Sequence, residues 1–301
     1  MIRVAGPLKP LGRGFGVFTQ MSPESEFHLA SGVLKVGCMK NLILCGLLAL
    51  TCAPAVAETQ DDILAGRILP GWQMAGGHYM AGLDLTLAPH WKTYWRAPGE
   101  TGIPPSFDWS GSRNVASVRL HWPSPEVIVS NGMQSIGYLD ALTLPVEVTP
   151  SDASQPVDLH LLMQLGICKD ICMPATLTLA TVLGGDVDAR IVAALRDGPI
   201  NGAAAGLVRI VCEVAPIDDG LHVVARIELP VQGTPETVVF ETADKTVWVA
   251  EASAARQGAV LTAATDFVAP KGAPFALQRR DLTVTVIGQG HSVEISGCPA
   301  P

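Results

Sequence analysis

Short apolar runs separated by turn-forming residues constrain the fold of this chain more than any other feature. From Tyr79 onward, strand-like runs such as YMAGLDLTLA, VASVRLHW and LTLPVEVT alternate with Gly, Pro, Asn and Asp. Short strands at regular spacing, with turn residues between them, are typical of a β-sandwich. The pattern therefore predicts an all-β fold.

One segment breaks this pattern and divides the chain. Residues 187–196 (VDARIVAALR) have helical periodicity, and we expect Asp186 to cap this helix and Gly198-Pro199 to end it. Strand-like runs resume after the small, flexible segment NGAAAG. We therefore predict a first β domain over residues 58–185, a helical linker over 186–206 and a second, smaller β domain over 207–301.

An apolar stretch near the start of the sequence has the three parts of a secretory signal peptide. Residues 41–57 (NLILCGLLALTCAPAVA) follow the basic start Met39-Lys40 and end in the small-residue site Ala55-Val56-Ala57. The stretch is shorter than the about 20 apolar residues that a spanning helix needs. We expect cleavage after Ala57, which makes Glu58 the first mature residue of a periplasmic protein.

Two other interpretations of this stretch fit the sequence less well. A buried helix conflicts with the polar ETQDD that follows directly, and a lipoprotein anchor on Cys52 fits poorly with Leu50 and Thr51 before it. Residues 1–38 precede a complete signal peptide, so we expect translation to start at Met39. The mature chain is then expected to have no membrane span.

The expected mature chain is acidic, with a net charge of −11 from 15 Lys and Arg against 26 Asp and Glu. An acidic surface repels phosphate groups, so nucleic-acid binding is disfavoured. The sequence contains no G-x-S-x-G, Walker or dinucleotide fingerprint, so hydrolase, nucleotidase and nicotinamide chemistry have no support. We expect no cofactor.

Four of the seven cysteines remain once Cys38, Cys45 and Cys52 leave with the signal peptide. An even number of cysteines in an exported protein favours disulfides over free thiols. The remaining cysteines are Cys168, Cys172, Cys212 and Cys298.

Cys168 and Cys172 are separated by three residues and lie between two strand-like runs, VDLHLLMQLGI and ATLTLATVL. In a straight strand their Cα atoms would lie about 13 Å apart, too far for a disulfide. The chain must turn, so we expect a β-hairpin with residues 169–171 as its loop and Pro174 on an edge strand. A disulfide that closes so small a loop adds little stability, which favours redox exchange over an inert staple.

Cys212 and Cys298 lie near the first and last strands of the predicted second domain. A bridge between them closes a long loop and contributes about 4 to 5 kcal/mol on the chain-entropy estimate. We therefore predict a structural disulfide here.

The residues upstream of the first cysteine pair resemble a known family. Residues 90–100 (HWKTYWRAPGE), 102–105 (GIPP) and 107–109 (FDW) look like the signature of the periplasmic N-terminal region of the DsbD and ScsB thiol-disulfide interchange proteins, and are closer to ScsB. The resemblance is strong over residues 71–180 and weaker beyond. It continues at Gly137-Tyr138, at Leu144-Pro145 and in the cysteine motif with Pro174.

This resemblance implies an immunoglobulin-like domain whose cysteine pair takes electrons from a membrane-embedded partner and passes them to oxidised, thioredoxin-like periplasmic proteins. Cys168 and Cys172 would be the exchanging pair, with Cys172 as the site of the mixed disulfide. The chain would then be a protein-disulfide reductase or part of such a system. DsbD has a longer spacing between its cysteines and continues into membrane helices, so we expect a separate membrane electron donor here.

The aromatic block also has a purely structural interpretation. Its large rings are suited to packing a core, and Arg96 and Glu100 are suited to pairing locally. The rings concerned are Trp91, Tyr94, Trp95, Phe107 and Trp109.

Two alternatives of other classes remain open. Cys168 and Cys172, with Met163 or Met173 nearby, would offer soft ligands to Cu(I), as in a copper-tolerance protein. The chain would otherwise be a non-catalytic binding β-sandwich with two staples. Zinc is disfavoured because four clustered N or S ligands are not apparent, and His160 is expected to be an ordinary strand residue.

The signal-peptide interpretation predicts that the exported protein begins at Glu58, because the Ala-Val-Ala site follows a complete apolar segment. N-terminal sequencing of the protein recovered from the periplasm checks this expectation. A cytoplasmic product that retains residues 1–57 would contradict both the signal peptide and the argument for disulfides.

Overall fold

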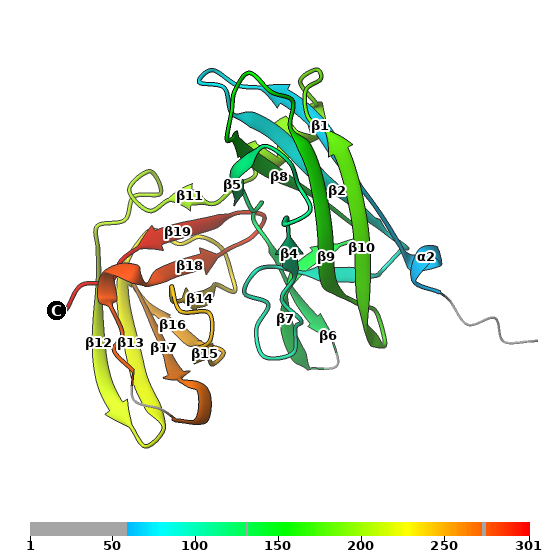
Figure 1. The fold of residues 1–301 in the computed structure, drawn as a ribbon. Coiled ribbons are helices and arrows are strands. Elements are labelled where there is room, and N and C mark those ends of the chain that lie inside the picture. The colour runs from blue at the N-terminus through cyan, green and yellow to red at the C-terminus, as the bar shows by residue number, and fades with distance from the viewer. Residues whose placement is uncertain (1–58, 131, 273–274) are drawn as a thin grey trace, which may run out of the picture. The chain divides into compact units, whose positions relative to one another are not determined.

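A computed structural model describes residues 59–130, 132–272 and 275–301, and these residues form mostly β-strands (Figure 1). The upstream extension, the signal peptide and the cleavage site after Ala57 lie outside the described residues. The prediction of an all-β fold is confirmed. The described residues belong to one compact unit, so the division at residues 186–206 stays a prediction.

Two antiparallel sheets with a shared core form the first sandwich. A short helix, α2 (Gln60–Ile63), precedes it. The strand order of one sheet is β1 (Leu64–Gln73), β2 (Tyr79–Leu87), β8 (Ala141–Pro150) and β5 (Val115–Leu120). The order of the other is β10 (Cys172–Val182), β9 (Asp158–Cys168), β3 (Lys92–Tyr94), β7 (Met133–Leu139) and β6 (Glu126–Ser130), with β4 (Ser106–Asp108) also paired to β9.

Side-chain alternation along β9 explains why this run forms a strand with one buried face. Successive side chains of a strand point to opposite faces of its sheet. The odd-numbered positions Leu159, Leu161, Met163 and Leu165 are all at most 2% exposed and lie in the core. The even-numbered positions between them are exposed. The alternation fixes which residues of β9 reach the outer face.

Two further sheets enclose a second core. One has the order β11 (Ile200–Asn201), β19 (Ser292–Ser296), β18 (Thr283–Ile287) and β14 (Thr237–Glu241). The other has the order β12 (Arg209–Ile217), β13 (Gly220–Glu228), β17 (Val260–Val268) and β15 (Trp248–Val249), with β16 (Ser253–Gln257) also paired to β17. Two short 3₁₀ turns, η1 (Pro270–Gly272) and η2 (Arg279–Asp281), lie between β17 and β18.

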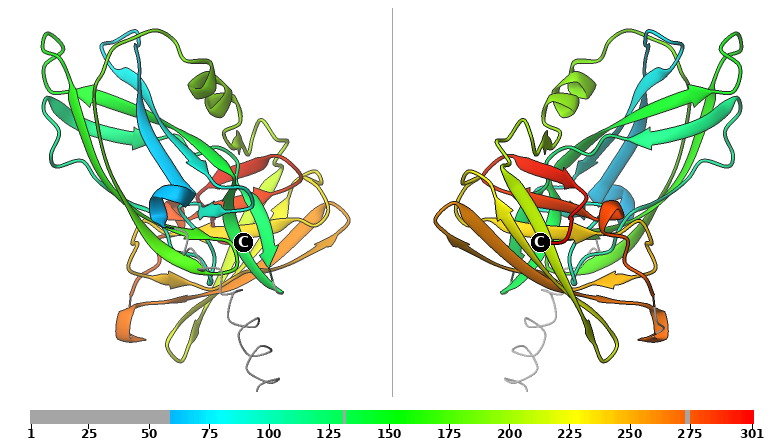
Figure 2. Two further views of the ribbon diagram at one scale, coloured as in Figure 1. Left: turned by 90° about the vertical axis from the view of Figure 1, so that its right-hand side faces the viewer. Right: turned by 90° about the vertical axis from the view of Figure 1, so that its left-hand side faces the viewer.

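The helix α3 (Ala189–Arg196) begins two residues later than predicted (Figure 2). Its cap is Asp188 and not Asp186, because Asp188 has an extended backbone and its side chain accepts a hydrogen bond from the Arg190 N–H at 2.8 Å. The same carboxylate pairs with the Arg190 guanidinium. Ile191 is fully buried and packs against Leu69 and Met80 of the first sandwich.

Cys212 and Cys298 form a disulfide across the second core. Cys212 lies in β12, Cys298 follows β19, and their Cα atoms are 5.5 Å apart. Both residues have no exposed surface and pack within the apolar cluster of the second sandwich. The bridge joins residues 86 positions apart in the sequence.

Replacing both cysteines of this bridge with alanine should destabilise the protein without removing exchange activity. The long loop that the bridge closes predicts a loss of about 4 to 5 kcal/mol, or roughly 10 °C or more in melting temperature. Alanine avoids placing an unpaired hydroxyl in the buried site. Thermal unfolding and a disulfide-exchange assay at a temperature where both proteins are folded check this expectation. Loss of exchange in a folded Cys212→Ala, Cys298→Ala variant would contradict the structural assignment.

Candidate active site

The first cysteine pair lies at the tip of a hairpin. Strands β9 and β10 pair antiparallel with Cys168 directly opposite Cys172, and the two sulfurs form a disulfide across a Cα–Cα distance of 4.2 Å. The backbone N–H of Lys169 donates to the carbonyl of Ile171 at 3.3 Å and closes the loop. The predicted hairpin is confirmed, and Pro174 lies on the edge strand β10 as expected.

The two sulfur-bearing residues have different surroundings. Cys168 is only 4% exposed, whereas Cys172 is exposed at the start of the edge strand. Neighbouring Ile171 is 74% exposed at the hairpin tip. A protein thiol that approaches this hairpin therefore meets Cys172, while Cys168 lies beneath the surface.

A local layer of side chains covers the outer face of the sheet beside Cys168. The alternation along β9 places Gly166 and Cys168 on the outer face, yet both are buried. A Cβ atom at Gly166 would lie 2.8 Å from both Ile103 Cβ and Tyr94 Cε2. Glycine at position 166 thus leaves room for the Tyr94 ring and Ile103 to lie over β9.

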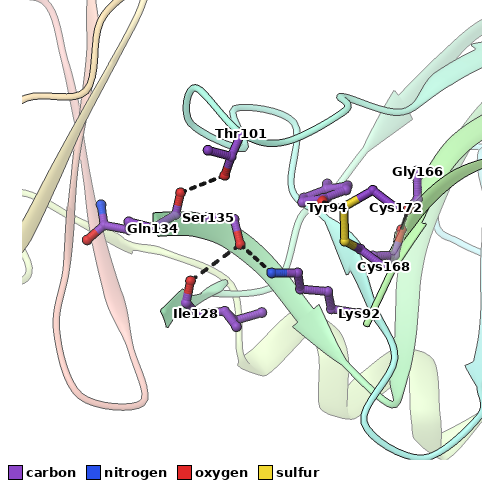
Figure 3. The surroundings of a disulfide bond; sticks show 10 residues. Lys92, Tyr94, Thr101, Ile128, Gln134, Ser135, Gly166, Cys168 and Cys172 are labelled. Carbon is purple, nitrogen blue, oxygen red and sulfur yellow. Dashed lines mark hydrogen bonds between the residues drawn. A yellow bond between two sulfur atoms is a disulfide. The ribbon is translucent and has the colours of Figure 1, made fainter. Parts of the chain in front are cut away.

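Tyr94 links this layer to the exposed sulfur (Figure 3). Its hydroxyl donates a hydrogen bond to Cys172 Sγ across 3.4 Å. Burial raises the pKa of Tyr94, so the phenol stays protonated and remains a donor. The sequence places this ring in the family signature and also suits it to core packing, without giving it a role at the cysteines. Side chains alternate along a strand, so Lys92 and Tyr94 lie on the same face of β3. This alternation is the feature of the sequence that could have predicted their common location.

The loop after β3 packs against the Tyr94 ring. A Cβ atom at Gly102 would collide with Pro98 and would lie 3.0 Å from Tyr94 Cδ1. Thr101 Oγ1 donates to the Gln134 carbonyl at 2.9 Å, which ties the loop to β7 (Figure 3). These contacts hold the loop against the ring that reaches Cys172.

Lys92 is a buried cation in the same layer. Its side chain is opposite Cys168 in the β3–β9 register, and the residue is 6% exposed. Its ammonium donates to Ser135 Oγ at 2.9 Å, and this hydroxyl donates to the Ile128 carbonyl at 3.4 Å (Figure 3). Burial lowers the pKa of Lys92 because water no longer stabilises the charged form.

Arg96 does not pair with Glu100, which corrects the local pairing expected from the sequence. Its guanidinium binds Glu241 at 2.9 Å and Glu294 at 2.5 Å, both from the second sandwich, and stacks 4.5 Å from the centroid of the Trp95 ring. Glu100 instead accepts a hydrogen bond from the backbone N–H of Glu251 at 3.3 Å. The reason is geometric: the fold brings two distant carboxylates to Arg96, and its guanidinium donates three hydrogen bonds to the two oxygens of Glu241.

The other aromatic residues of this block support the core. Trp91 and Trp95 are buried, while Phe107 and Trp109 are partly buried and pack against the same cluster. The structural interpretation is therefore confirmed for these four rings. Tyr94 alone among the five forms a hydrogen bond to the cysteine pair in the part of the chain that the structure describes.

The methionines considered as copper ligands do not share a sheet face with the sulfurs. Met163 is 1% exposed in the first core, and Met173 is opposite the buried Ile167 and packs on the same core. His160 is an exposed residue of β9. Within residues 59–301 as described, no group of three or more His, Cys, Asp and Glu side chains could hold a metal ion.

The sequence and the structure are both similar to thiol-disulfide interchange proteins. Residues 64–183 match the family described as "Thiol:disulfide interchange protein DsbD, N-terminal". The crystal structure of the N-terminal periplasmic domain of ScsB from Proteus mirabilis is similar with a TM-score of 0.64 and 20% sequence identity, and the match covers 81% of this chain and 96% of that one. No curated protein matches the chain.

These similarities confirm the expected resemblance and fold class. The match to ScsB confirms an immunoglobulin-like β-sandwich followed by further β structure, because its coverage of this chain extends well beyond residues 64–183. Where helices are described, none is long and apolar enough to cross a membrane.

The Tyr94 contact predicts that Tyr94→Phe raises the pKa of the Cys172 thiol by about one unit. The hydroxyl stabilises the thiolate by a charge-assisted hydrogen bond worth about 1.5 to 3 kcal/mol, and its removal favours the protonated thiol. The pH dependence of Cys172 alkylation, measured in the Cys168→Ser background with and without Tyr94→Phe, checks the shift. An unchanged pKa in the folded variant would show that the hydroxyl does not act on the sulfur.

Proposed function

Because residues 64–183 form a DsbD/ScsB-like N-terminal domain, we propose that this chain is a periplasmic thiol-disulfide interchange protein. It passes electrons between a membrane or thioredoxin-like donor and oxidised periplasmic proteins through Cys168 and Cys172. The observation that carries the proposal is the asymmetric disulfide at the hairpin tip, which joins an exposed sulfur to a buried one.

The first half of the reaction reduces the pair. A thiolate of the donor attacks the exposed Cys172 sulfur, a donor–Cys172 disulfide forms, and the Cys168–Cys172 bond breaks with its electron pair left on Cys168. The second thiol of the donor then attacks the donor sulfur that is bonded to Cys172, and Cys172 is released as a thiolate. The donor dithiol is oxidised to a disulfide, and the pair gains two electrons and two protons.

The second half reverses these roles toward an oxidised client. The Cys172 thiolate attacks the client disulfide and releases one client thiol, which leaves Cys172 in a mixed disulfide. Cys168 then attacks Cys172, restores the intramolecular disulfide and releases the second client thiol. Tyr94 supports both halves, since its hydroxyl donates to the sulfur that carries charge when Cys172 is released or attacks.

Cys172 lies where the thiol of another protein can reach it, which favours exchange with a protein partner over a purely structural role. Cys172 begins the edge strand β10, and Ile171 and Ile103 are exposed close to the pair. An accessible sulfur with an apolar surround is what a thioredoxin-like partner needs for covalent exchange. Two disulfides in one chain suit an oxidising compartment, which supports the periplasmic assignment.

The proposed order of attack predicts that Cys168→Ser traps partners and Cys172→Ser does not. The probe is a thioredoxin-like protein that keeps only its attacking cysteine, activated as a mixed disulfide with thionitrobenzoate. Cys168→Ser should form a covalent adduct through Cys172, because no neighbouring thiol remains to resolve it. In Cys172→Ser the remaining thiol is buried, so its reaction should be at least about tenfold slower and no adduct should accumulate while Cys168→Ser reacts. Non-reducing electrophoresis and release of thionitrobenzoate measure both.

Three outcomes separate the functional hypotheses. The adduct on Cys168→Ser alone supports exchange through Cys172. Tight Cu(I) binding by the reduced pair without a trapped partner would support the copper-handling alternative. No adduct with either variant, together with a wild-type disulfide that resists reduction below about −300 mV, would identify the pair as a staple in a binding sandwich.

A further inference from the structure

Lys92 is a buried positive charge that forms no ion pair in the described part of the chain. Its only hydrogen-bond partner there is the Ser135 hydroxyl, and no carboxylate lies within 4.0 Å of its ammonium. A charge removed from water without an opposite charge is costly. Burial accordingly lowers the pKa of Lys92. An anion that forms beside such a buried cation is therefore strongly stabilised.

The sheet register places Lys92 in one row with both sulfurs. Lys92 is opposite Leu139 on β7 and opposite Cys168 on β9, and Cys168 is opposite Cys172 on β10. Directly opposed residues of antiparallel strands have side chains on the same face, with Cβ atoms about 4.5 to 5.5 Å apart. Figure 3 shows the Lys92 side chain running along the sheet beside the disulfide toward Ser135.

We propose that the ammonium group of Lys92 is the counterion of the Cys168 thiolate and makes the buried sulfur a good leaving group. The inference rests on the proposed function, in which attack on Cys172 releases Cys168. Lys92 is thus a positioning residue that acts through Cys168, while the attacking thiol reaches only Cys172.

The charge balance of the exchange step explains why such a residue is needed. A reductant thiolate forms a new bond to Cys172 and leaves the electron pair of the broken disulfide on Cys168. Cys168 is 4% exposed, and burial alone raises the pKa of a thiol and disfavours the thiolate. A thiol of lower pKa leaves faster, so a cation beside Cys168 accelerates the opening of the disulfide.

Other charged and titratable groups near the row are arranged differently. Glu126 of β6 lies opposite Gly137, on the same face as Lys92, but it is exposed. Tyr94 is turned toward Cys172 and hydrogen-bonds its sulfur. The remaining groups are exposed, in the hairpin loop and at the neighbouring strand ends: Lys169, Asp170, His90 and Asp140. Water screens these exposed charges more strongly than it screens the buried ammonium of Lys92.

The test compares Lys92→Met and Lys92→Gln with the wild-type chain. Glutamine can keep the hydrogen bond to Ser135 without the charge, so it serves as the second variant if methionine prevents folding. We expect both changes to slow the reduction of the disulfide by dithiothreitol about tenfold at constant pH. In the Cys172→Ser background we expect both to raise the pKa of Cys168, measured by thiolate absorbance, by about one unit.

Three matched controls separate charge from structure. Lys92→Arg keeps the charge and should keep both the rate and the pKa within about threefold of the wild type. Ser135→Ala removes the hydrogen bond but not the charge, and Glu126→Gln removes the exposed carboxylate on the same face; both should leave the Cys168 pKa nearly unchanged. A folded Lys92→Met or Lys92→Gln protein with an unshifted Cys168 pKa and an unchanged reduction rate would overturn the proposal.

These measurements test the role of Lys92 separately from the proposed function. Dithiothreitol and thiolate absorbance need no protein partner, so a shifted Cys168 pKa without any trapped partner would support the role of Lys92 and reject interchange with proteins. A trapped partner together with an unshifted Cys168 pKa would support interchange with proteins and reject the role of Lys92.

Discussion

The register of β9 against β10 is the constraint on which the site depends. Pairing Cys168 with Cys172 closes the disulfide, and the same register places every odd-numbered residue of β9 from 159 to 167 in the core. A slip of one residue would turn Leu161, Met163 and Leu165 outward and would turn the sulfur toward the core. The burial of a row of apolar side chains therefore stabilises the position of one reactive bond.

The outer face of this sheet combines features that a strand surface ordinarily lacks. Gly166 leaves space for the Tyr94 ring, the loop after β3 packs on that ring, and Lys92 lies under the same cover. Cys172 consequently has a hydroxyl as its polar neighbour, and Cys168 has Lys92 directly opposite it on β3. A single disulfide thus connects two different environments. This asymmetry favours attack at Cys172 and leaves the negative charge on Cys168.

The sequence predicted the hairpin, the edge position of Pro174 and the all-β class because these depend on local patterns of alternation, turn residues and cysteine spacing. It misplaced the helix cap because Asp186 and Asp188 satisfy the same local rule, and only the contacts of Arg190 select the second. The sequence does not distinguish Tyr94 from the rings that pack the core, because a block rich in aromatic residues does not reveal which ring faces outward. The partners of Arg96 follow it by 145 and 198 positions, a separation at which no local pattern carries information.

Arg96 couples the stabilities of the two sandwiches. It lies two residues after Tyr94, and its two carboxylate partners belong to β14 and β19 of the second sandwich. Disorder in that sandwich would leave Arg96 without both partners, and disorder around β3 would leave the nearly buried Glu241 with only the long contact to Lys245. Residues that share such a network have effects on stability that do not add. A substitution that disorders the second core is therefore expected to weaken the anchoring of Arg96, which lies where the loop that packs on Tyr94 begins.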